Sequence, residues 1–268
     1  MTTAVENNDL SKAPILTHLL ELRKRLIVCM VFFALIFGVS YYFVADIYAF
    51  LMRPLALAFD NPEQRRMIYT GLHEAFSTYL KLSFYSALFF SIPLILMQLW
   101  RFVAPGLYQH EQRSLMSAFA LTPVLFLLGA SLAFFVIMPM AWEFFLGFER
   151  LGSGTGVAVE LEARVSEYLS LVIQLILAFG IAFELPVLLF VLAKAGLVTA
   201  DLLREHRRHM VVVTFLVAAF ITPPDLISQI ALGAPVLILY EISILMIKWS
   251  SADSVARQRQ MIKDGFQS

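Results

Sequence analysis

The sequence predicts an all-α, polytopic membrane protein with six transmembrane helices in a curved bundle. Hydrophobic residues make up 60% of its 268 residues and charged residues 15%, whereas a soluble domain has roughly 45–50% and 25%. The mean hydropathy is +0.78, and apolar runs recur along the whole chain. A soluble core of this length cannot bury so much apolar surface, so the lipid bilayer is the first partner that the sequence implies.

Residues 1–25 are polar and form a predicted cytoplasmic segment that includes a short amphipathic helix. Thr17 is its expected N-cap, and Glu21 lies four residues before Arg25, the spacing of an intrahelical ion pair. The apolar run 26–44 follows directly. It is too long for the core of a signal peptide and lacks a small-residue cleavage site, which predicts a retained first span.

Five further apolar segments are the remaining predicted spans: residues 78–99, 115–140, 168–193, 210–221 and 226–247. The fifth has only 12 residues, or about 18 Å of helix against a hydrocarbon core of roughly 30 Å. The following turn favours an immediate start of the sixth helix, with Thr222 as N-cap and Pro223 and Asp225 in its first turn. Gln229 shares the helical face of Asp225. We therefore expect a polar apex within the membrane.

Proline residues interrupt four of the six spans. Each removes a backbone donor and tends to bend its helix, so the sequence predicts a curved bundle rather than a straight pore. These residues are Pro93, Pro123, Pro139, Pro186 and Pro235.

The distribution of basic residues predicts the orientation. Fourteen of the 20 Lys and Arg residues fall in the two terminal segments and in the loops after the second and fourth spans. Because basic residues accumulate on the cytoplasmic side, both termini are expected in the cytoplasm. The predicted divisions are a cytoplasmic segment 1–25, a six-span membrane domain 26–248 and a cytoplasmic tail 249–268.

Several function classes are excluded by what the sequence lacks. A formal net charge of +0 argues against nucleic-acid binding, which needs a basic face. The glycine-rich run 152–156 has no following lysine, so it is not a phosphate loop. His110-Glu111 begins like a zinc-protease motif, but Ser114 stands where the second histidine is required. With the single Cys29, the sequence predicts no metal site, no cofactor and no enzyme.

Glu184 is the most unusual ionisable residue, because it lies in the middle of an apolar run and two residues before Pro186. A carboxyl group at that depth faces the protein interior or a wet cavity, or else stays protonated. It is either a polar contact or proton-responsive site, or a structural carboxyl bonded to a neighbouring helix. Glu241 lies near the end of the sixth span, where pairing with Lys248 is expected.

The segment 102–113 carries exposed aromatic and apolar residues next to an acid. Phe102, Leu107 and Tyr108 beside Glu111 suggest a docking surface, although an aromatic belt at the membrane interface is the commoner explanation of such a segment taken by itself.

Taken in order, four motifs of the chain resemble the twin-arginine translocase C subunit family, TatC. They are His18-Leu-Leu-Glu-Leu-Arg-Lys-Arg25, Phe102-x-Ala-Pro-Gly-Leu107-x-x-x-Glu111, Phe179-Gly-x-x-Phe-Glu184-x-Pro186, and Thr222-Pro-Pro-Asp225 with Ser228-Gln229. Each motif alone is weak evidence, whereas their joint order between residues 17 and 248 is specific.

The resemblance implies a glove-like bundle in the bacterial cytoplasmic membrane that binds the twin-arginine signal peptides of folded precursor proteins. It implies recognition by Glu21 and Glu111, with Arg23, Phe102 and Leu107 around them, and a role for Pro54 in the first external loop. Further implied roles fall on Glu184 at the concave face, on Thr222 and Gln229 toward single-span TatA or TatB partners, and on Asp225 in the adjoining turn. Gln112 departs from many relatives, which have a basic residue there.

The chemistry of these residues supports that function independently of the resemblance to the family. Carboxylates grip the planar fork of a guanidinium by bidentate, charge-assisted bonds, whereas lysine offers only a point charge. The resemblance also implies self-association in a larger complex and the proton-motive force as the energy source. The main alternative is a proton-coupled secondary transporter that uses Glu184.

Overall fold

The computed structural model describes residues 3–59, 66–103, 112–152, 162–221 and 226–265. These residues are helical apart from short connections, and among them the β-structure is limited to one isolated parallel bridge between Ile68 and Arg164. The predicted all-α membrane fold is therefore confirmed.

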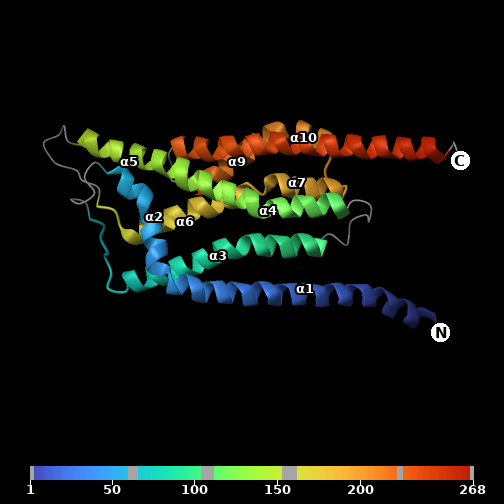
Figure 1. The fold of residues 1–268 in the computed structure, drawn as a ribbon, viewed down its shortest axis with the longest axis horizontal. Helices are drawn as coiled ribbons and strands as arrows, with labels where there is room; N and C mark the ends of the chain where they lie inside the picture. Colours follow the sequence, from blue (N-terminus) through green and yellow to red (C-terminus); the bar gives the residue numbers. More distant parts are fainter. Residues whose placement is uncertain (1–2, 60–65, 104–111, 153–161, 222–225, 266–268) are drawn as a thin grey trace.

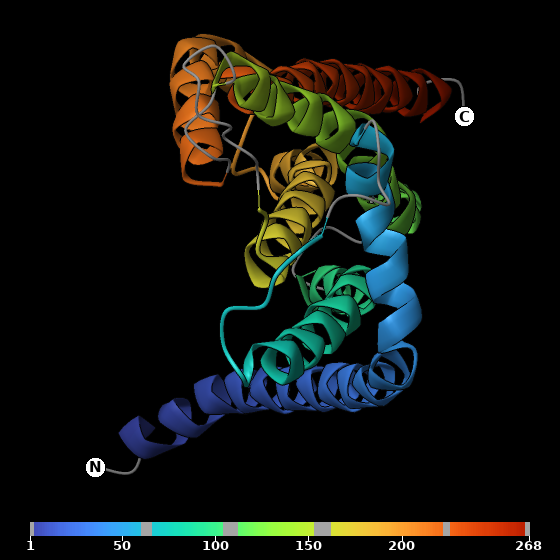
Figure 2. The same cartoon turned by 90° about the vertical axis from the view of Figure 1, so that its left-hand side faces the viewer.

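The long helices run roughly parallel, and the start of α1 (Thr3–Tyr42) lies at the same end as the finish of α10 (Leu226–Gly265) (Figure 1). We call this the terminal end of the bundle, and the other the opposite end. In Figure 2 the helices form a curved row, with α1 at one side, α3 (Glu74–Val103) and α6 (Val165–Ala182) in the middle, and α10 at the other side. The curvature agrees with the prediction made from the prolines.

Five helical stretches are long and apolar enough to cross a membrane: His18–Tyr42, Glu74–Phe102, Phe119–Gly147, Val165–Lys194 and Gln229–Ser250. They correspond to the predicted spans one, two, three, four and six. The predicted fifth span corresponds to α9 (Arg207–Ile221), which has 15 residues, or about 22 Å of helix. This helix is longer than the expected 12 residues but still shorter than a bilayer core of roughly 30 Å.

The first two predicted elements differ from the structure at their borders. Thr17 lies inside the continuous helix α1, so its prediction as an N-cap is wrong. The connection between the first and second predicted spans contains a helix that was not predicted, α2 (Val44–Ala58), which crosses the opposite end of the bundle (Figure 1). One further helix was not predicted: α8 (Ala200–Glu205), which is N-capped by Thr199. The helix of the sixth span, α10, continues far beyond residue 249.

Two prolines change the helices around them. The third span consists of α4 (Gln112–Leu132), a π-helical segment η4 (Ala133–Ile137) and α5 (Met138–Gly152). Pro139 lies two residues after η4, and the wider helical turn accommodates the proline ring, which would otherwise clash with the carbonyl four residues earlier. Pro186 lies at the start of α7 (Leu185–Lys194), and the chain between α6 and α7 is broken at Phe183 and Glu184.

Two buried clusters hold the bundle together, one toward each end. The first joins α2, α5 and α6 around Leu51, Trp142 and Tyr168, whose hydroxyl donates to the carbonyl oxygen of Leu51 at 2.8 Å. The second joins α7, α8 and α10, and there the hydroxyl of Tyr240 donates to the carbonyl oxygen of Leu203 at 2.7 Å. Burying phenol rings with their hydroxyl groups satisfied fixes the ends of these helices relative to each other.

Candidate functional site

The candidate recognition site lies at the terminal end, where α1 packs along α3. This packing brings Glu21 and Arg23 of α1 to the same region as Phe102, near the end of α3. Leu107 and Glu111, the other two predicted recognition residues, lie outside the described residues. The helix α4 begins at Gln112, directly after Glu111 in the sequence, and it starts at this same end (Figure 1).

Glu21 binds a guanidinium group within the chain itself. Both Nε and Nη2 of Arg25 donate to Oε1 of Glu21, the first at 3.1 Å. The predicted intrahelical pair is therefore confirmed. The Glu21 side chain remains 36% exposed, so the carboxylate is accessible from the surface.

Arg25 also ties α1 to α3. Its Nη1 donates to Oε1 of Gln98 at 3.1 Å, and its Nη2 donates to the carbonyl oxygen of Arg101 at 3.2 Å. One guanidinium group thus fixes the position of the Glu21 carboxylate against the end of α3. The sequence motif contains Arg25, but its link to Gln98, 73 residues away, has no local signal in the sequence.

An aromatic pair lies beside these polar groups. The rings of His18 and Phe102 stack with centroids 4.1 Å apart and planes 20° apart. His18 is exposed together with Leu19 and Leu20, and Arg23 is exposed on the next turn. The site therefore combines a guanidinium-binding carboxylate with an aromatic and aliphatic surface, which suits a peptide that carries arginine next to apolar residues.

Glu184 occupies a separate place inside the bundle. Its side chain is 5% exposed, and among the described residues neither carboxylate oxygen has a hydrogen-bond partner. The buried hydroxyl of Thr122 on α4 lies against it without reaching hydrogen-bond geometry. This hydroxyl belongs to a neighbouring helix, so the position of Glu184 fits both interpretations made from the sequence, a functional polar group and a structural carboxyl that contacts another helix.

The predicted polar apex is described only in part, because Thr222 and Asp225 lie outside the described residues. Gln229 on α10 donates from Nε2 to the carbonyl oxygen of Phe215 at 3.0 Å, which links α10 to α9. Nearby on α9, Thr214 is buried and its hydroxyl has no partner among the described residues. Glu241 pairs with Arg207 at the start of α9 at 2.6 Å, so its predicted pairing with Lys248 is wrong.

Pro54 lies in the middle of α2 and is buried next to Leu51 and Leu55. Its missing N–H leaves the carbonyl of Phe50 without the usual helical donor. Its position at the opposite end separates it from the recognition residues at the terminal end (Figure 1).

The structure also shows a clasp at the opposite end that sequence reasoning missed. Backbone bonds join Ile68 to Ala163 and Val165, at 3.2 and 3.3 Å. The carboxylate of Glu74 at the start of α3 accepts hydrogen bonds from the backbone of Thr70 and Gly71 and from the hydroxyl of Ser166 at the start of α6. On α2, the ring of Tyr48 contacts that of Tyr79 on α3, and burial raises the pKa of Tyr48 to about 12, so this phenol stays protonated at any physiological pH.

Among the described residues, no group of three or more His, Cys, Asp or Glu side chains could hold a metal ion.

The sequence is similar to those of known proteins of one family. Residues 17–235 match the family described as Sec-independent protein translocase protein (TatC). The chain is 46% identical to the TatC of Rickettsia prowazekii (strain Madrid E), over 85% of the chain and 90% of that protein. It is 45% identical to the TatC of Magnetococcus marinus, over 87% of the chain and 83% of that protein.

A solved structure has the same fold. The crystal structure of the twin-arginine translocase receptor TatC superposes with a TM-score of 0.73 at 35% identity, and the match covers 87% of the chain and 99% of that structure. The match over residues 17–235, the identity to curated relatives and the shared fold together establish that the chain belongs to the TatC family of Sec-independent protein translocase proteins.

Proposed function

We propose that this chain binds twin-arginine signal peptides of folded precursor proteins at the terminal end, which faces the cytoplasm of a bacterium. As a TatC protein, it is a multi-pass membrane component of the twin-arginine translocase and not an enzyme.

The observation that carries the proposal is the bond between Glu21 and Arg25. A carboxylate that already accepts two N–H groups from one guanidinium is positioned for the geometry that arginine offers and lysine lacks. We infer that one signal-peptide arginine engages Glu21 beside or in place of Arg25, while Glu111 engages the other.

The aromatic surface supports binding of the residues that follow the arginines. Phe102 is held by its stack on His18, and exposed Leu19 and Leu20 follow His18 on α1. We assign Phe102 and Leu107 to the apolar part of the peptide. Arg23 is assigned to the rim of the site, where it limits the negative potential of two nearby carboxylates.

Partner recruitment is assigned to α9 and α10. The face of α9 carries large exposed apolar residues, among them Val212, Leu216 and Phe220, and the bond from Gln229 marks a polar point within the same helix pair. A single-span helix of the TatA or TatB type would cover this face and meet Thr222, Asp225 and Gln229. Self-association and the use of the proton-motive force, with Glu184 and Pro54 as contributing residues, complete the proposal.

The bundle geometry is compatible with two cytoplasmic termini, because α1 begins and α10 finishes at one end (Figure 1). The predominance of Lys and Arg in the segments at this end supports the cytoplasmic assignment. With α9 as a sixth, short span, the successive spans alternate in direction along the chain.

Photo-cross-linking tests the proposal. A precursor with a photoreactive residue next to its two arginines should label the chain in membrane vesicles, and a Lys-Lys version should label it several-fold less. Glu21→Gln and Glu111→Gln should each remove most of the labelling, whereas Glu205→Gln, which changes an exposed acid on α8, should not. Equal labelling by both precursors, or labelling unaffected by Glu21→Gln and Glu111→Gln, would remove the receptor assignment.

A further inference from the structure

A large apolar pocket opens between four elements near the opposite end of the bundle, far from the recognition residues. It has a volume of about 430 Å³ and is lined by residues of α2, α3, α6 and the α4–η4 segment. This volume lies in the range of small-molecule sites, roughly 300–1,000 Å³. None of the proposed recognition or partner contacts uses this pocket.

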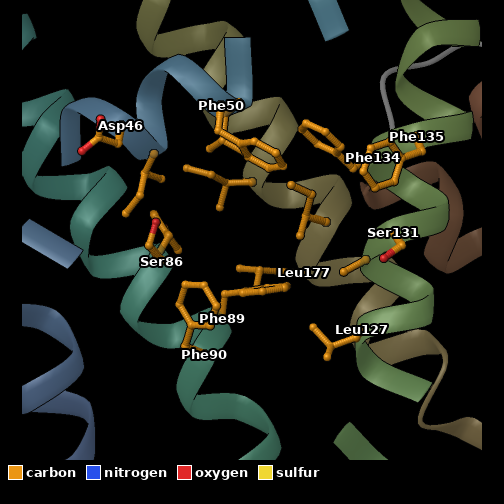
Figure 3. Close-up of a pocket in the computed structure, with 16 residues that line it drawn as sticks. Asp46, Phe50, Ser86, Phe89, Phe90, Leu127, Ser131, Phe134, Phe135 and Leu177 are labelled. Atoms are coloured by element: carbon orange, nitrogen blue, oxygen red, sulfur yellow. The ribbon is translucent and has the colours of Figure 1, made fainter. Parts of the chain in front are cut away.

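The pocket is a lengthwise slot rather than a round cavity. On α3 its lining extends from Tyr85 to Phe90, and on the α4–η4 segment from Leu127 to Phe135. The latter stretch corresponds to about 12 Å along the helix axis. Figure 3 shows Phe89, Phe90 and Leu127 at one end of this slot and Phe50, Phe134 and Phe135 at the other. Such a shape suits a hydrocarbon chain that lies parallel to the helices.

The polar groups of the lining are few. Among the described residues, Asp46 is the single charged residue that lines the pocket. In Figure 3 it lies at the α2 side, far from Leu127, while Ser86 on α3 and Ser131 on α4 lie on opposite sides of the slot. Asp46 is exposed and belongs to the first turn of α2. The slot is thus apolar along its length and carries a carboxylate at its α2 end.

A cation completes this rim. Arg53 lies seven residues after Asp46, two helical turns along α2, and its guanidinium is 5.7 Å from the ring centroid of Phe50. Phe50 lines the pocket and stacks on Phe134 at 4.6 Å. The helix α2 therefore contributes an acid and an aromatic ring to the lining, and the guanidinium of Arg53 lies beside that ring without lining the pocket itself.

In a membrane, this rim would lie at the level of the lipid headgroups. Tyr41 and Tyr42, which closely precede α2, are exposed, and exposed tyrosines gather at the membrane–water interface. The slot then extends from the interface into hydrocarbon. An empty apolar slot lacks the dispersion contacts that an acyl chain would supply, which favours a lipid as its occupant.

We propose that this pocket is a binding site for one zwitterionic phospholipid from the leaflet at the opposite end. An acyl chain fills the slot between α3 and the α4–η4 segment. Asp46 binds the ammonium group of the headgroup and Arg53 binds its phosphate. An anionic lipid without an amine would offer Asp46 no partner and would be repelled by it.

Native mass spectrometry of the detergent-purified chain tests this site. The chain is mixed with equal amounts of phosphatidylethanolamine and phosphatidylglycerol of the same acyl composition. We expect one retained phosphatidylethanolamine per chain, with at least about a five-fold preference, or roughly 1 kcal/mol. Equal retention of the two lipids, or a preference for phosphatidylglycerol, would overturn the proposed headgroup recognition.

Two neighbouring residues of α4 provide a matched pair of variants. Leu127 and Leu128 are exposed to similar extents, 50% and 54%, but only Leu127 lines the pocket. Leu127→Trp should fill the slot and reduce lipid retention several-fold, whereas Leu128→Trp should leave it unchanged. Asp46→Asn should abolish the preference for phosphatidylethanolamine while retention of total lipid persists. Equal retention by both tryptophan variants, each shown to be folded by its thermal unfolding curve, would contradict the site.

Discussion

At the scale of single residues, Arg25 connects the proposed recognition residue Glu21 to the packing of α1 on α3. Its guanidinium contacts Glu21 on its own helix and Gln98 and the carbonyl of Arg101 on α3. Such a planar fork serves several acceptors at fixed angles, which an ammonium group cannot do. Arg25 is therefore a positioning residue for the Glu21 carboxylate.

Arg25→Lys tests this role through stability. The substitution keeps the charge but loses the bonds to α3, and we expect it to lower the free energy of unfolding in detergent by about 1–3 kcal/mol. Arg23→Lys is the matched control, because Arg23 is exposed on the same helix, and it should change stability by less than about 0.5 kcal/mol. Equal effects of the two substitutions would mean that the contacts of Arg25 do not hold α1 on α3.

Glu184 supplies the second prediction at this scale. A buried carboxyl group without a partner lowers stability by about 1–3 kcal/mol, so Glu184→Leu should raise the thermal unfolding temperature of the purified chain. The same variant should impair export of a twin-arginine precursor in cells, because the proposed function assigns Glu184 a role in transport. Higher stability with unchanged export would remove Glu184 from the proposed machinery, and Glu184→Gln separates the effect of charge from that of shape.

At the scale of elements, the packing of α4 on α6 depends on two glycines. A Cβ atom at residue 129 would lie 2.3 Å from the carbonyl oxygen of Phe179, and one at residue 180 would lie 2.6 Å from the ring of Phe126. The two backbones therefore approach closely through small residues, as is common between membrane helices. This close contact lies next to the break that holds Glu184.

Gly129→Ala should consequently separate the two helices. Because the obstructing atom belongs to the backbone, the expected loss is about 1–3 kcal/mol of unfolding free energy. A Cβ atom at Gly38 on α1 would meet no heavy atom within 4 Å, so Gly38→Ala should be neutral or stabilising by up to about 1 kcal/mol. A comparable loss for both variants would indicate a general effect of replacing helix glycines rather than a packing contact.

The elements that the sequence predicted well are those with strong local signals. Long apolar runs identified the regions of α3, α6 and α10, and Pro186 indicated the break before α7. The helix α2 was missed because it is short and carries Asp46, Arg53 and Pro54 within it, features that are typical of a loop. Its helical state depends on packing against α5 and α6, which no local pattern reveals.

At the scale of the whole molecule, the arrangement of the candidate site also could not be predicted from local sequence patterns. The motifs identified Glu21 and Phe102, but their approach depends on the packing of α1 along α3. The stack of His18 on Phe102 and the clasp between Glu74 and Ser166 join residues 84 and 92 positions apart, respectively. Such contacts arise only once the chain is folded, so no local pattern distinguishes their residues in the sequence.

The topology of the whole chain yields a prediction of its own. In a Cys29→Ser background, single cysteines replace Asn8, Asp60, Ser153 or Gln260, and intact cells without an outer membrane are treated with a membrane-impermeant maleimide. Positions 60 and 153 should react, while positions 8 and 260 should react only after the membrane is opened, because six spans with α9 included return the chain to the cytoplasm. Labelling of position 260 in intact cells would leave five spans and contradict the assignment.

The central claim is that Glu21 and Glu111 together bind two guanidinium groups, and a binding cycle tests it most directly. Fluorescent signal peptides with Arg-Arg or Lys-Lys are titrated against the chain in lipid nanodiscs, both unmodified and as Glu21→Gln and Glu111→Gln. Each substitution should weaken Arg-Arg binding by about tenfold, or roughly 1.4 kcal/mol, and should weaken Lys-Lys binding far less. Equal losses for the two peptides would show that the carboxylates supply only unspecific negative charge.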